Sequence, residues 1–278
     1  MTTLAEALAH CREALAGLTE SPRLDAELLL CAAAGISRTT LMAWPERTLA
    51  ADQRRRLQVL LARRSSGEPM AYILGQREFW DLTLRVGPGV LVPRPDTERL
   101  VEATLAALPV DAALTCVDLG TGSGAVACAL ARERPAWTLI AIEHAAPALA
   151  IAADNARRLG LGNLQLLRGD WLDAIAPRSL DAIVSNPPYV CADDPHLARG
   201  DLQHEPITAL AAGADGLDAI RRIVADAPRC LRPGGWLALE HGWDQGPSVR
   251  ALLHAAGLRD IRTQRDLAGH ERVTSGRT

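Results

Sequence analysis

The 278-residue sequence is poor in aromatic side chains, has no long apolar run and has no grouping of cysteines. Aromatic residues make up 3% of the chain, so an apolar core has to come mainly from leucine and alanine. No apolar stretch approaches the ~20 residues that a membrane-spanning helix needs, and we expect no membrane association. The six cysteines form no Cys-x-x-Cys pair and no cluster with histidine at zinc spacing, so we expect no metal site.

The chain also has no excess of positive charge. Lysine and arginine together number 30 against 33 aspartates and glutamates, a net charge of −3. No overall positive field is available to hold phosphate groups, and stable nucleic-acid binding is not expected. The first residues carry Glu6 and Glu13 among leucines at helical spacing, unlike a signal peptide. With cysteines that read as small buried hydrophobes, this pattern predicts a cytoplasmic protein.

The length suits two domains, and the first seventy or so residues have a helical pattern. Apolar side chains recur at three- and four-residue steps from Leu4 to Leu15. Ser21 is placed to cap a second helix that stops near Gly35, and two more helices are predicted at 37–44 and 52–64. We predict an N-terminal helical domain over residues 1–75 that docks a substrate.

Between Arg77 and Val92 the apolar residues alternate and are interrupted by Gly87-Pro88-Gly89. This pattern predicts a β-hairpin within a linker over residues 76–95. Asp96 is predicted to cap a helix at 97–108, whose first turn carries Glu98.

After Pro109, strand and helix patterns alternate to the end of the chain. Such alternation is typical of a parallel sheet covered by helices on both faces, so we predict an α/β domain over residues 96–278. The predicted strands lie at 114–119, 138–143, 164–168, 180–184 and 236–240, followed by two closing strands at 261–265 and 272–275.

A glycine-rich run, D-x-G-x-G-x-G over residues 118–124, stands where the first of these strands turns into a helix. Glycines there let backbone amides approach a ligand, and Glu143 at the end of the next strand is placed to accept both ribose hydroxyls of an adenosine. A dinucleotide loop would need G-x-G-x-x-G. The form found instead resembles the S-adenosylmethionine loop of Rossmann-like methyltransferases, the alternative being a tight turn that binds nothing. The cofactor contacts are predicted at Gly120, Thr121, Gly122, Ser123, Gly124 and Glu143.

Asp170 and Trp171 follow the third predicted strand, at the sheet edge where the adenine of such a cofactor would lie. Asp170 is predicted to accept from the adenine amino group and Trp171 to pack on the ring. Trp171 has an equally good interpretation as an anchor in the core.

The fourth predicted strand runs directly into Asn186-Pro187-Pro188-Tyr189. Two prolines stiffen the backbone and remove two donors, so the loop is rich in acceptors. A planar amide or amino group offers two N–H donors, which the Asn186 oxygen and the Pro187 carbonyl can accept while Tyr189 stacks on its face. We predict catalytic roles for Asn186, Pro187 and Tyr189, and substrate binding along residues 186–189. The alternative is a rigid polar turn without a catalytic role.

From about Ser66 onward the sequence resembles the PrmC/HemK family, the protein-(glutamine-N5) methyltransferases of peptide chain release factors. The resemblance rests on residues 67–75, 92–98, 118–124, 185–189, 213–218 and 266–269. It implies S-adenosyl-L-methionine as cofactor, S-adenosyl-L-homocysteine as product, and release factors as protein substrates, with cofactor contacts also at Trp171 and Asn186. It further implies that the methylated glutamine belongs to a Gly-Gly-Gln loop.

The sequence departs from the family pattern at Glu143, where aspartate is more usual, and at His204, where the family commonly has phenylalanine. Two other functions fit the motifs. An adenine-N6 nucleic-acid methyltransferase would use the same loop but needs a basic recognition domain, and a non-catalytic module would bind the cofactor without methyl transfer. The arginines over residues 54–64 are interpreted as a solvated helix face or as a contact for an acidic release factor or ribonucleic acid.

Overall fold

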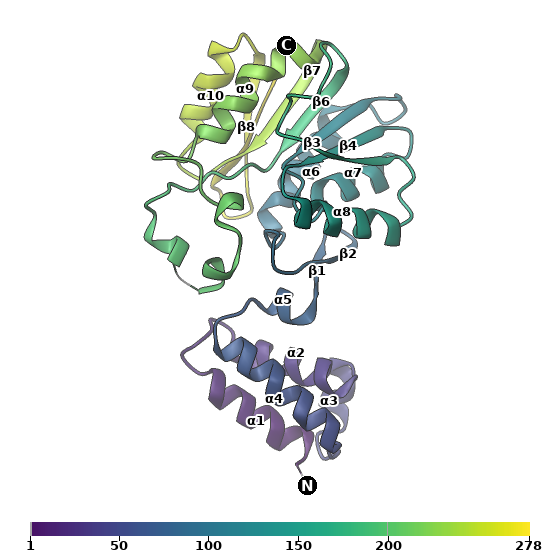
Figure 1. Cartoon of the computed structure of the whole chain (residues 1–278), viewed down its shortest axis with the longest axis vertical. Coiled ribbons are helices and arrows are strands. Elements are labelled where there is room, and N and C mark those ends of the chain that lie inside the picture. Colours follow the sequence, from purple (N-terminus) through teal and green to yellow (C-terminus); the bar gives the residue numbers. More distant parts are fainter. Residues whose placement is uncertain (1, 199) are drawn as a thin grey trace. The chain divides into compact units, whose positions relative to one another are not determined.

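The computed structural model describes residues 2–198 and 200–278, which divide into two compact units (Figure 1). Unit 1 contains the chain up to Gln76 together with Ala198–His204, and unit 2 contains Arg77–Leu197 and Glu205–Thr278. Within the described residues, no helix has both the length and the apolar character that crossing a membrane requires.

Unit 1 is a bundle of short helices, drawn in purple and blue in Figure 1. The first helix begins at a capping box, in which Thr3 and Glu6 each accept from the other's backbone N–H. Ser21 precedes the second helix as predicted but makes no capping hydrogen bond. The last helix of the unit was not predicted, because it has five residues and shows no helical period. The helices are α1 (Leu4–Leu15), α2 (Pro22–Ala34), α3 (Arg38–Ala43), α4 (Ala51–Ser65) and α5 (Met70–Leu74).

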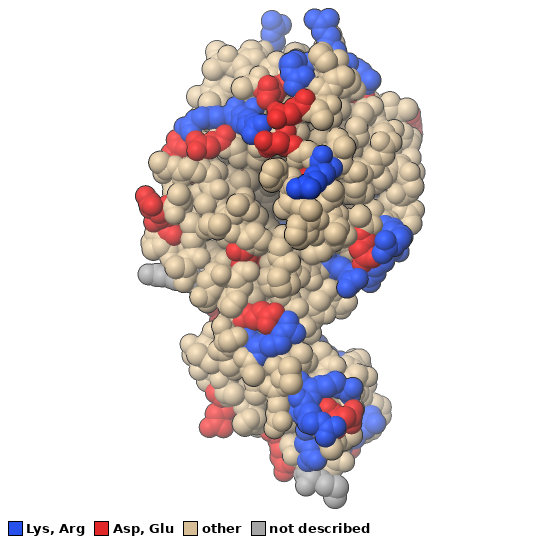
Figure 2. Space-filling model, in the orientation of Figure 1, with Lys and Arg blue, Asp and Glu red and all other residues tan. Residues whose placement is uncertain are grey.

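Much of the predicted basic surface on α4 is neutralised inside unit 1. Arg64 is buried and pairs with Asp25 and Asp201, each at 2.8 Å. Arg63 pairs with Glu68 at 2.5 Å, so both arginines hold the unit together. Acidic and basic side chains lie close together over much of the face that Figure 2 shows.

The predicted hairpin exists but turns earlier than expected. Its strands are β1 (Gln76–Phe79) and β2 (Leu82–Arg85), joined through Trp80, whose φ is +58°. The predicted turn at Gly87-Pro88-Gly89 is present, with the Val90 N–H bonded to the Gly87 carbonyl at 3.3 Å, but the prediction that it joins the two strands of the hairpin is wrong. The residues after those glycines form no strand, because the Val92 N–H bonds the Glu205 carboxylate at 3.0 Å instead of a neighbouring strand.

Asp96 does not cap the helix that follows, so this prediction is also wrong. The 3₁₀ turn η1 (Pro95–Thr97) precedes α6 (Glu98–Ala107). The Asp96 carboxylate faces Arg272 at 3.4 Å rather than the helix end. Glu98 does lie in the first turn of α6, and its Oε1 accepts from the Trp80 N–H at 2.8 Å.

Unit 2 is built on a seven-stranded sheet with the order β5-β4-β3-β6-β7-β9-β8. The first five strands in this order are parallel, and β9 is antiparallel to both of its neighbours. This confirms the predicted α/β sheet with closing strands. The strands are β3 (Thr115–Leu119), β4 (Thr138–Glu143), β5 (Leu164–Arg168), β6 (Leu180–Ser185), β7 (Leu231–Glu240), β8 (Arg259–Arg265) and β9 (Glu271–Arg277).

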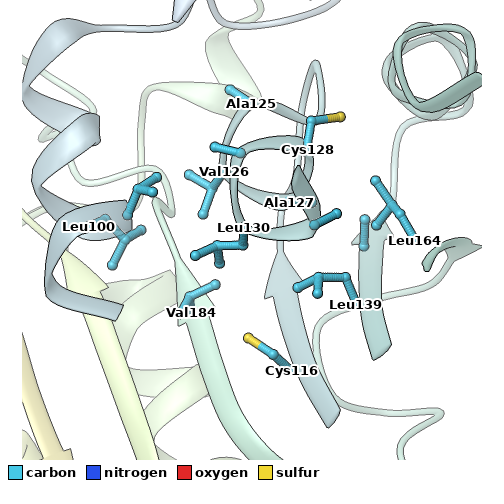
Figure 3. Packing of buried hydrophobic residues seen from close by; sticks show 14 of the residues in the cluster. Leu100, Cys116, Ala125, Val126, Ala127, Cys128, Leu130, Leu139, Leu164 and Val184 are labelled. Carbon is cyan, nitrogen blue, oxygen red and sulfur yellow. The ribbon is translucent and has the colours of Figure 1, made fainter. Parts of the chain in front are cut away.

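Helices cover both faces of this sheet (Figure 1). Successive strand residues face opposite sides, so Ala182 and Val184 belong to one apolar cluster and Ile183 to the other. Figure 3 shows the first cluster, in which Val126 and Leu130 pack among side chains of the sheet and α6. The covering helices are α6, α7 (Ala125–Glu133) and α8 (Ala146–Arg158) on one face, and α9 (Asp218–Cys230) and α10 (Gly246–Ala255) on the other.

Asp118 holds the turn after β3 through two hydrogen bonds. Its carboxylate accepts from the Thr121 hydroxyl at 2.5 Å and from the Ala127 N–H at 3.2 Å. Burial raises the pKa of Asp118 to about 7, although both of these donors act to lower it.

The loop after β6 is held by a close backbone approach. The Tyr189 carbonyl accepts from Nε2 of Gln245 at 3.0 Å. Gly216 has a φ of +73°, and a Cβ there would lie 2.2 Å from the same carbonyl oxygen. Only glycine fits this position, because any side chain would displace the loop.

We predict that Gly216→Ala destabilises unit 2 more than Gly234→Ala does. Gly234 has a similar φ of +77° but has no atom within 4 Å of its would-be Cβ. Both variants bear the left-handed strain of about 1–2 kcal/mol, and overlap with the Tyr189 carbonyl adds about 1–3 kcal/mol at Gly216. Denaturation followed by tryptophan fluorescence measures the difference, because all tryptophans but Trp44 lie in unit 2. Equal destabilisation of the two variants would show that the loop after β6 can move away from an alanine at position 216 without a cost in stability.

Asp118 should make stability fall as pH rises from about 4 to about 7. Over this window the folded state holds a proton that the unfolded chain has released, so its contribution is present at low pH and lost above the folded pKa. Asp118→Asn cannot titrate. The free energy of unfolding of Asp118→Asn, measured relative to that of wild type, should therefore rise with pH over this window, by at most about 1.4 kcal/mol per pH unit. Chemical denaturation at several pH values measures this, and a pH-independent difference would contradict it.

Candidate active site

A cavity of about 470 Å³ lies at the carboxyl edge of the sheet in unit 2. The strand order reverses between β3 and β6, which is where ligands bind in open α/β sheets. The structure brings most of the predicted site residues to this one cavity. Those that line it are Gly120, Gly122, Glu143, Asp170, Trp171, Asn186 and Pro188.

The glycine loop approaches the cavity through its first two glycines. Gly120, Gly122 and Gly124 all have positive φ, at +66°, +56° and +84°. Gly124 is the N-cap of α7 and does not line the cavity, and a Cβ there would lie 3.3 Å from the Ala152 Cβ. Thr121 and Ser123 are buried in the loop, where Thr121 bonds Asp118. Thr121, Ser123 and Gly124 therefore shape the turn and are not among the described residues that line the cavity.

Glu143 lies on the cavity wall at the end of β4. Its Oε2 accepts from the Gly122 N–H and its Oε1 from the Ala145 N–H, both at 2.9 Å. Each carboxylate oxygen can accept a further hydrogen bond, so the side chain is oriented while keeping acceptor capacity. Glu143 thus connects the glycine loop to the place predicted for the ribose.

Trp171 combines the two interpretations that its sequence position allowed. It lines the cavity, and it also packs on the apolar cluster below α9. Its φ is +46°, an uncommon value for a bulky residue, and its ring lies 3.4 Å from a would-be Cβ at Gly120. Asp170 beside it pairs with Arg222 at 2.8 Å, which holds its carboxylate at the cavity.

Asn186 directly follows β6 and lines the cavity, with its Nδ2 donating to the Thr97 hydroxyl at 3.0 Å. This contact leaves the amide oxygen available as an acceptor. Pro187 is buried, and the Tyr189 hydroxyl donates to Glu240 at 3.2 Å. Burial is the main reason that the pKa of Tyr189 is raised. Neither Pro187 nor Tyr189 is among the described residues that line the cavity, so their direct roles stay predictions.

The outer wall of the cavity was missed by sequence reasoning. It contains Leu91 before α6, and Pro206 and Thr208 from the loop after Tyr189. The fully buried Glu205 carboxylate joins the two segments, through Arg94 at 2.5 Å and the Val92 N–H at 3.0 Å. The signal was present in the acidic residue before Pro206, but its partners lie more than a hundred positions away.

His204, the departure noted in the sequence, is placed in unit 1 with Gly67. A Cβ at Gly67 would lie 3.2 Å from the His204 Nε2, so the ring packs against that glycine. Among the described residues no group of three or more histidine, cysteine or acidic side chains is arranged to hold a metal ion.

Comparison with known proteins places this site in a family. Residues 6–75 match the PrmC N-terminal domain, and residues 97–200 match the methyltransferase small domain. The chain is 51% identical to the release factor glutamine methyltransferase of Pseudomonas aeruginosa over 93% of its own length and 94% of that protein. It is 48% identical to that of Coxiella burnetii over 100% and 99%, and 47% identical to that of Escherichia coli over 96% of each.

Solved structures agree on the fold of the sheet domain. A 16S rRNA methyltransferase from T. thermophilus, solved with AdoMet and guanosine, superposes with a TM-score of 0.55 at 21% identity over 73% of this chain and 49% of that one. A methyltransferase from Pyrococcus furiosus has a TM-score of 0.54 at 16% identity over 81% and 98%. The near-complete coverage by relatives of about half identity decides the family: the chain belongs to the release factor glutamine methyltransferases.

Proposed function

We propose that this chain transfers the methyl group of S-adenosyl-L-methionine to the side-chain amide nitrogen, N5, of the glutamine in the Gly-Gly-Gln loop of peptide chain release factors. The observation that carries this proposal is the anchoring of Asn186. Its Nδ2 is held by Thr97 on the cavity wall, so its oxygen is left to accept from a substrate N–H. The names of the relatives support the substrate class.

The residues of the cavity fit S-adenosyl-L-methionine, which supplies an electrophilic methyl group on a sulfonium and leaves as S-adenosyl-L-homocysteine. Glu143 has the acceptor capacity for the ribose hydroxyls, and Gly120 and Gly122 present backbone without side chains. Asp170 and Trp171 supply an acceptor and a ring face for the adenine. Thr121, Ser123 and Gly124 would act by shaping the loop.

The chain's contribution to the chemistry is to orient a weak nucleophile. Amide resonance, whose scale is the ~18–20 kcal/mol barrier to rotation about the C–N bond, makes the glutamine nitrogen unreactive. The Asn186 oxygen and the Pro187 carbonyl accept its two N–H groups and direct the nitrogen at the methyl group, while Pro188 and Tyr189 bound its plane. These acceptors stabilise the positive charge that grows on nitrogen, which sheds its proton after the methyl group is bound.

We place this reaction in the cytoplasm, because none of the six cysteines is paired, as in a reducing compartment. The deciding assay incubates the enzyme with labelled cofactor and purified release factor, with and without replacement of the Gly-Gly-Gln glutamine. Label that depends on this glutamine supports the proposal. Labelling of nucleic acid instead would favour the adenine-N6 alternative, and binding of cofactor without transfer would favour the non-catalytic one.

We predict that substitution of Glu143 weakens cofactor binding, whereas substitution of Asn186 lowers the rate of methyl transfer. Glu143→Ala removes charged hydrogen bonds worth about 1.5–3 kcal/mol each and should weaken S-adenosyl-L-methionine binding at least tenfold, whereas Glu143→Asp keeps a carboxylate as the matched control. Asn186→Ala should lower the single-turnover rate by ~10²–10³. Asn186→Asp should also impair turnover, with cofactor affinity preserved or raised by the added negative charge. Calorimetry and single-turnover methylation measure both, and wild-type rates in folded Asn186 variants would refute its role.

We further propose that the helical unit over residues 1–75 docks the release factor. Removing these residues should lower kcat/KM on whole release factor while sparing S-adenosyl-L-methionine affinity and methylation of a short Gly-Gly-Gln peptide. Methylation of the short peptide depends on the cavity and not on docking. It therefore distinguishes a loss of docking from damage to the cavity. Full activity of the shortened enzyme on whole release factor would contradict the docking role.

A further inference from the structure

Unit 1 has a cavity of its own, with a volume of about 270 Å³. This unit 1 cavity is lined by residues 5–12 of α1, Arg23 and Glu27 of α2, residues 38–42 of α3, and Pro45. It is smaller than the ~300–1,000 Å³ of typical small-molecule sites. Its size therefore suits a few side chains of a partner better than a whole cofactor.

Glu27 is a buried charge at this cavity. Its side chain is 6% exposed, and its carboxylate accepts from Arg23 Nε at 3.0 Å and from Arg38 Nη2 at 2.5 Å. The hydrogen bonds from Arg23 and then Arg38 hold the pKa of Glu27 below its ordinary value, so the carboxylate stays ionised. Pairing a buried carboxylate with exposed arginines adds little to stability. We therefore explain Glu27 by the orientation that it gives to two guanidinium groups.

The arginines at the unit 1 cavity keep donors for a ligand. A guanidinium has five N–H donors, of which Arg23 uses its Nε on Glu27 and Arg38 uses its Nε and Nη2. Arg12, in the last turn of α1, lines the same cavity and is exposed. It forms no ion pair with any residue that the structure describes. Three arginines and one glutamate leave the lining with a net charge of +2.

The rest of this lining is apolar and is held in place by the backbone. The Pro45 carbonyl accepts from the Ala5 N–H at 2.9 Å, which ties the chain after α3 to the first turn of α1. Leu8 and Met42 line the cavity from these two helices, and Met42 is 65% exposed. Binding sites for protein segments combine apolar anchor points with charged groups, whereas the binding of a nucleic-acid backbone rests on phosphate contacts. The apolar lining therefore favours a protein segment.

We propose that the unit 1 cavity binds a segment of the release factor that carries a carboxylate beside an apolar side chain. The guanidinium groups of Arg12 and Arg23 suit a carboxylate, because paired N–H donors match its two oxygens. Leu8 and Met42 receive the apolar side chain. A carboxylate also reduces the positive charge of the lining. This inference identifies a surface for the docking role of unit 1, and it rests on the proposed methylation of release factors.

Reversing the charge of Arg12 tests the proposal, because this arginine is exposed and is not paired with Glu27. The affinity of Arg12→Glu for purified release factor, measured by calorimetry with S-adenosyl-L-homocysteine present, should fall at least about tenfold, and the loss should shrink as salt is raised. Met42→Gln should weaken the same binding about threefold or more, because it removes an apolar contact. Both variants should keep the wild-type affinity for S-adenosyl-L-methionine, the wild-type rate on a short Gly-Gly-Gln peptide and the wild-type thermal unfolding.

Arg55→Glu is the matched control. Arg55 is another exposed arginine of unit 1 that forms no ion pair with a described residue, but it lies on α4 and does not line the cavity. Arg55→Glu should bind release factor as wild type does, and equal affinities of Arg12→Glu and Arg55→Glu overturn the cavity proposal even where methylation is intact.

Binding and methylation are measured separately, so the two proposals can fail separately. If wild type binds release factor without methylating its glutamine, the proposed function falls, while the affinities of the variants still decide the role of the cavity. Binding of a single-stranded RNA that depends on Arg12, with release-factor binding unaffected by Arg12→Glu, would assign the cavity to nucleic acid and overturn the proposal. No binding of release factor by wild type overturns both.

Discussion

The parallel pairing of β3 with β6 is the constraint on which the site depends. Leu119 and Ser185 are register partners, and the Ser185 hydroxyl donates to the Leu119 carbonyl at 2.7 Å. This pairing ends both strands at one level, so the glycine loop and Asn186 leave the sheet side by side. Because the chain turns to opposite faces after these strands, no helix closes the gap between them. The cavity is a consequence of strand order before any site residue is considered.

Two buried acids at the carboxyl edge of the sheet lower the free energy of unfolding at neutral pH, but they fix the positions of the loops there. Asp118 and Glu240 are both nearly inaccessible, and burial raises the pKa of each to about 7. A chain selected for stability alone would place apolar groups there. Asp118 instead sets the path of the glycine loop through Thr121, and Glu240 accepts from the Tyr189 hydroxyl. Both acids hold loops that leave the sheet at this edge without lining the cavity themselves, and this is typical of sites in which orientation matters more than charge at the reacting atoms.

Much of the fold was predictable because its signals are local. Strand alternation, the glycine-rich run and Glu143 at a strand end are recognised from neighbours in the sequence, and these signals located the sheet and the glycine loop. The predictions failed where distant residues decide. Asp96 looks like a helix cap until Arg272 is seen beside it, and residues 90–92 look like a strand until Glu205 is seen to take the Val92 N–H. Thr97, which accepts from the Asn186 amide, lies 89 positions away in the sequence and could not be connected to it by spacing.

The same contacts explain why asparagine suits the position at the end of β6. An aspartate there would remove the NH₂ group that Thr97 accepts from. Asparagine satisfies Thr97 with its donor end and leaves its acceptor end for the proposed substrate, without a net charge. The contact with Thr97 therefore favours asparagine at this position as well as the proposed contact with the substrate does.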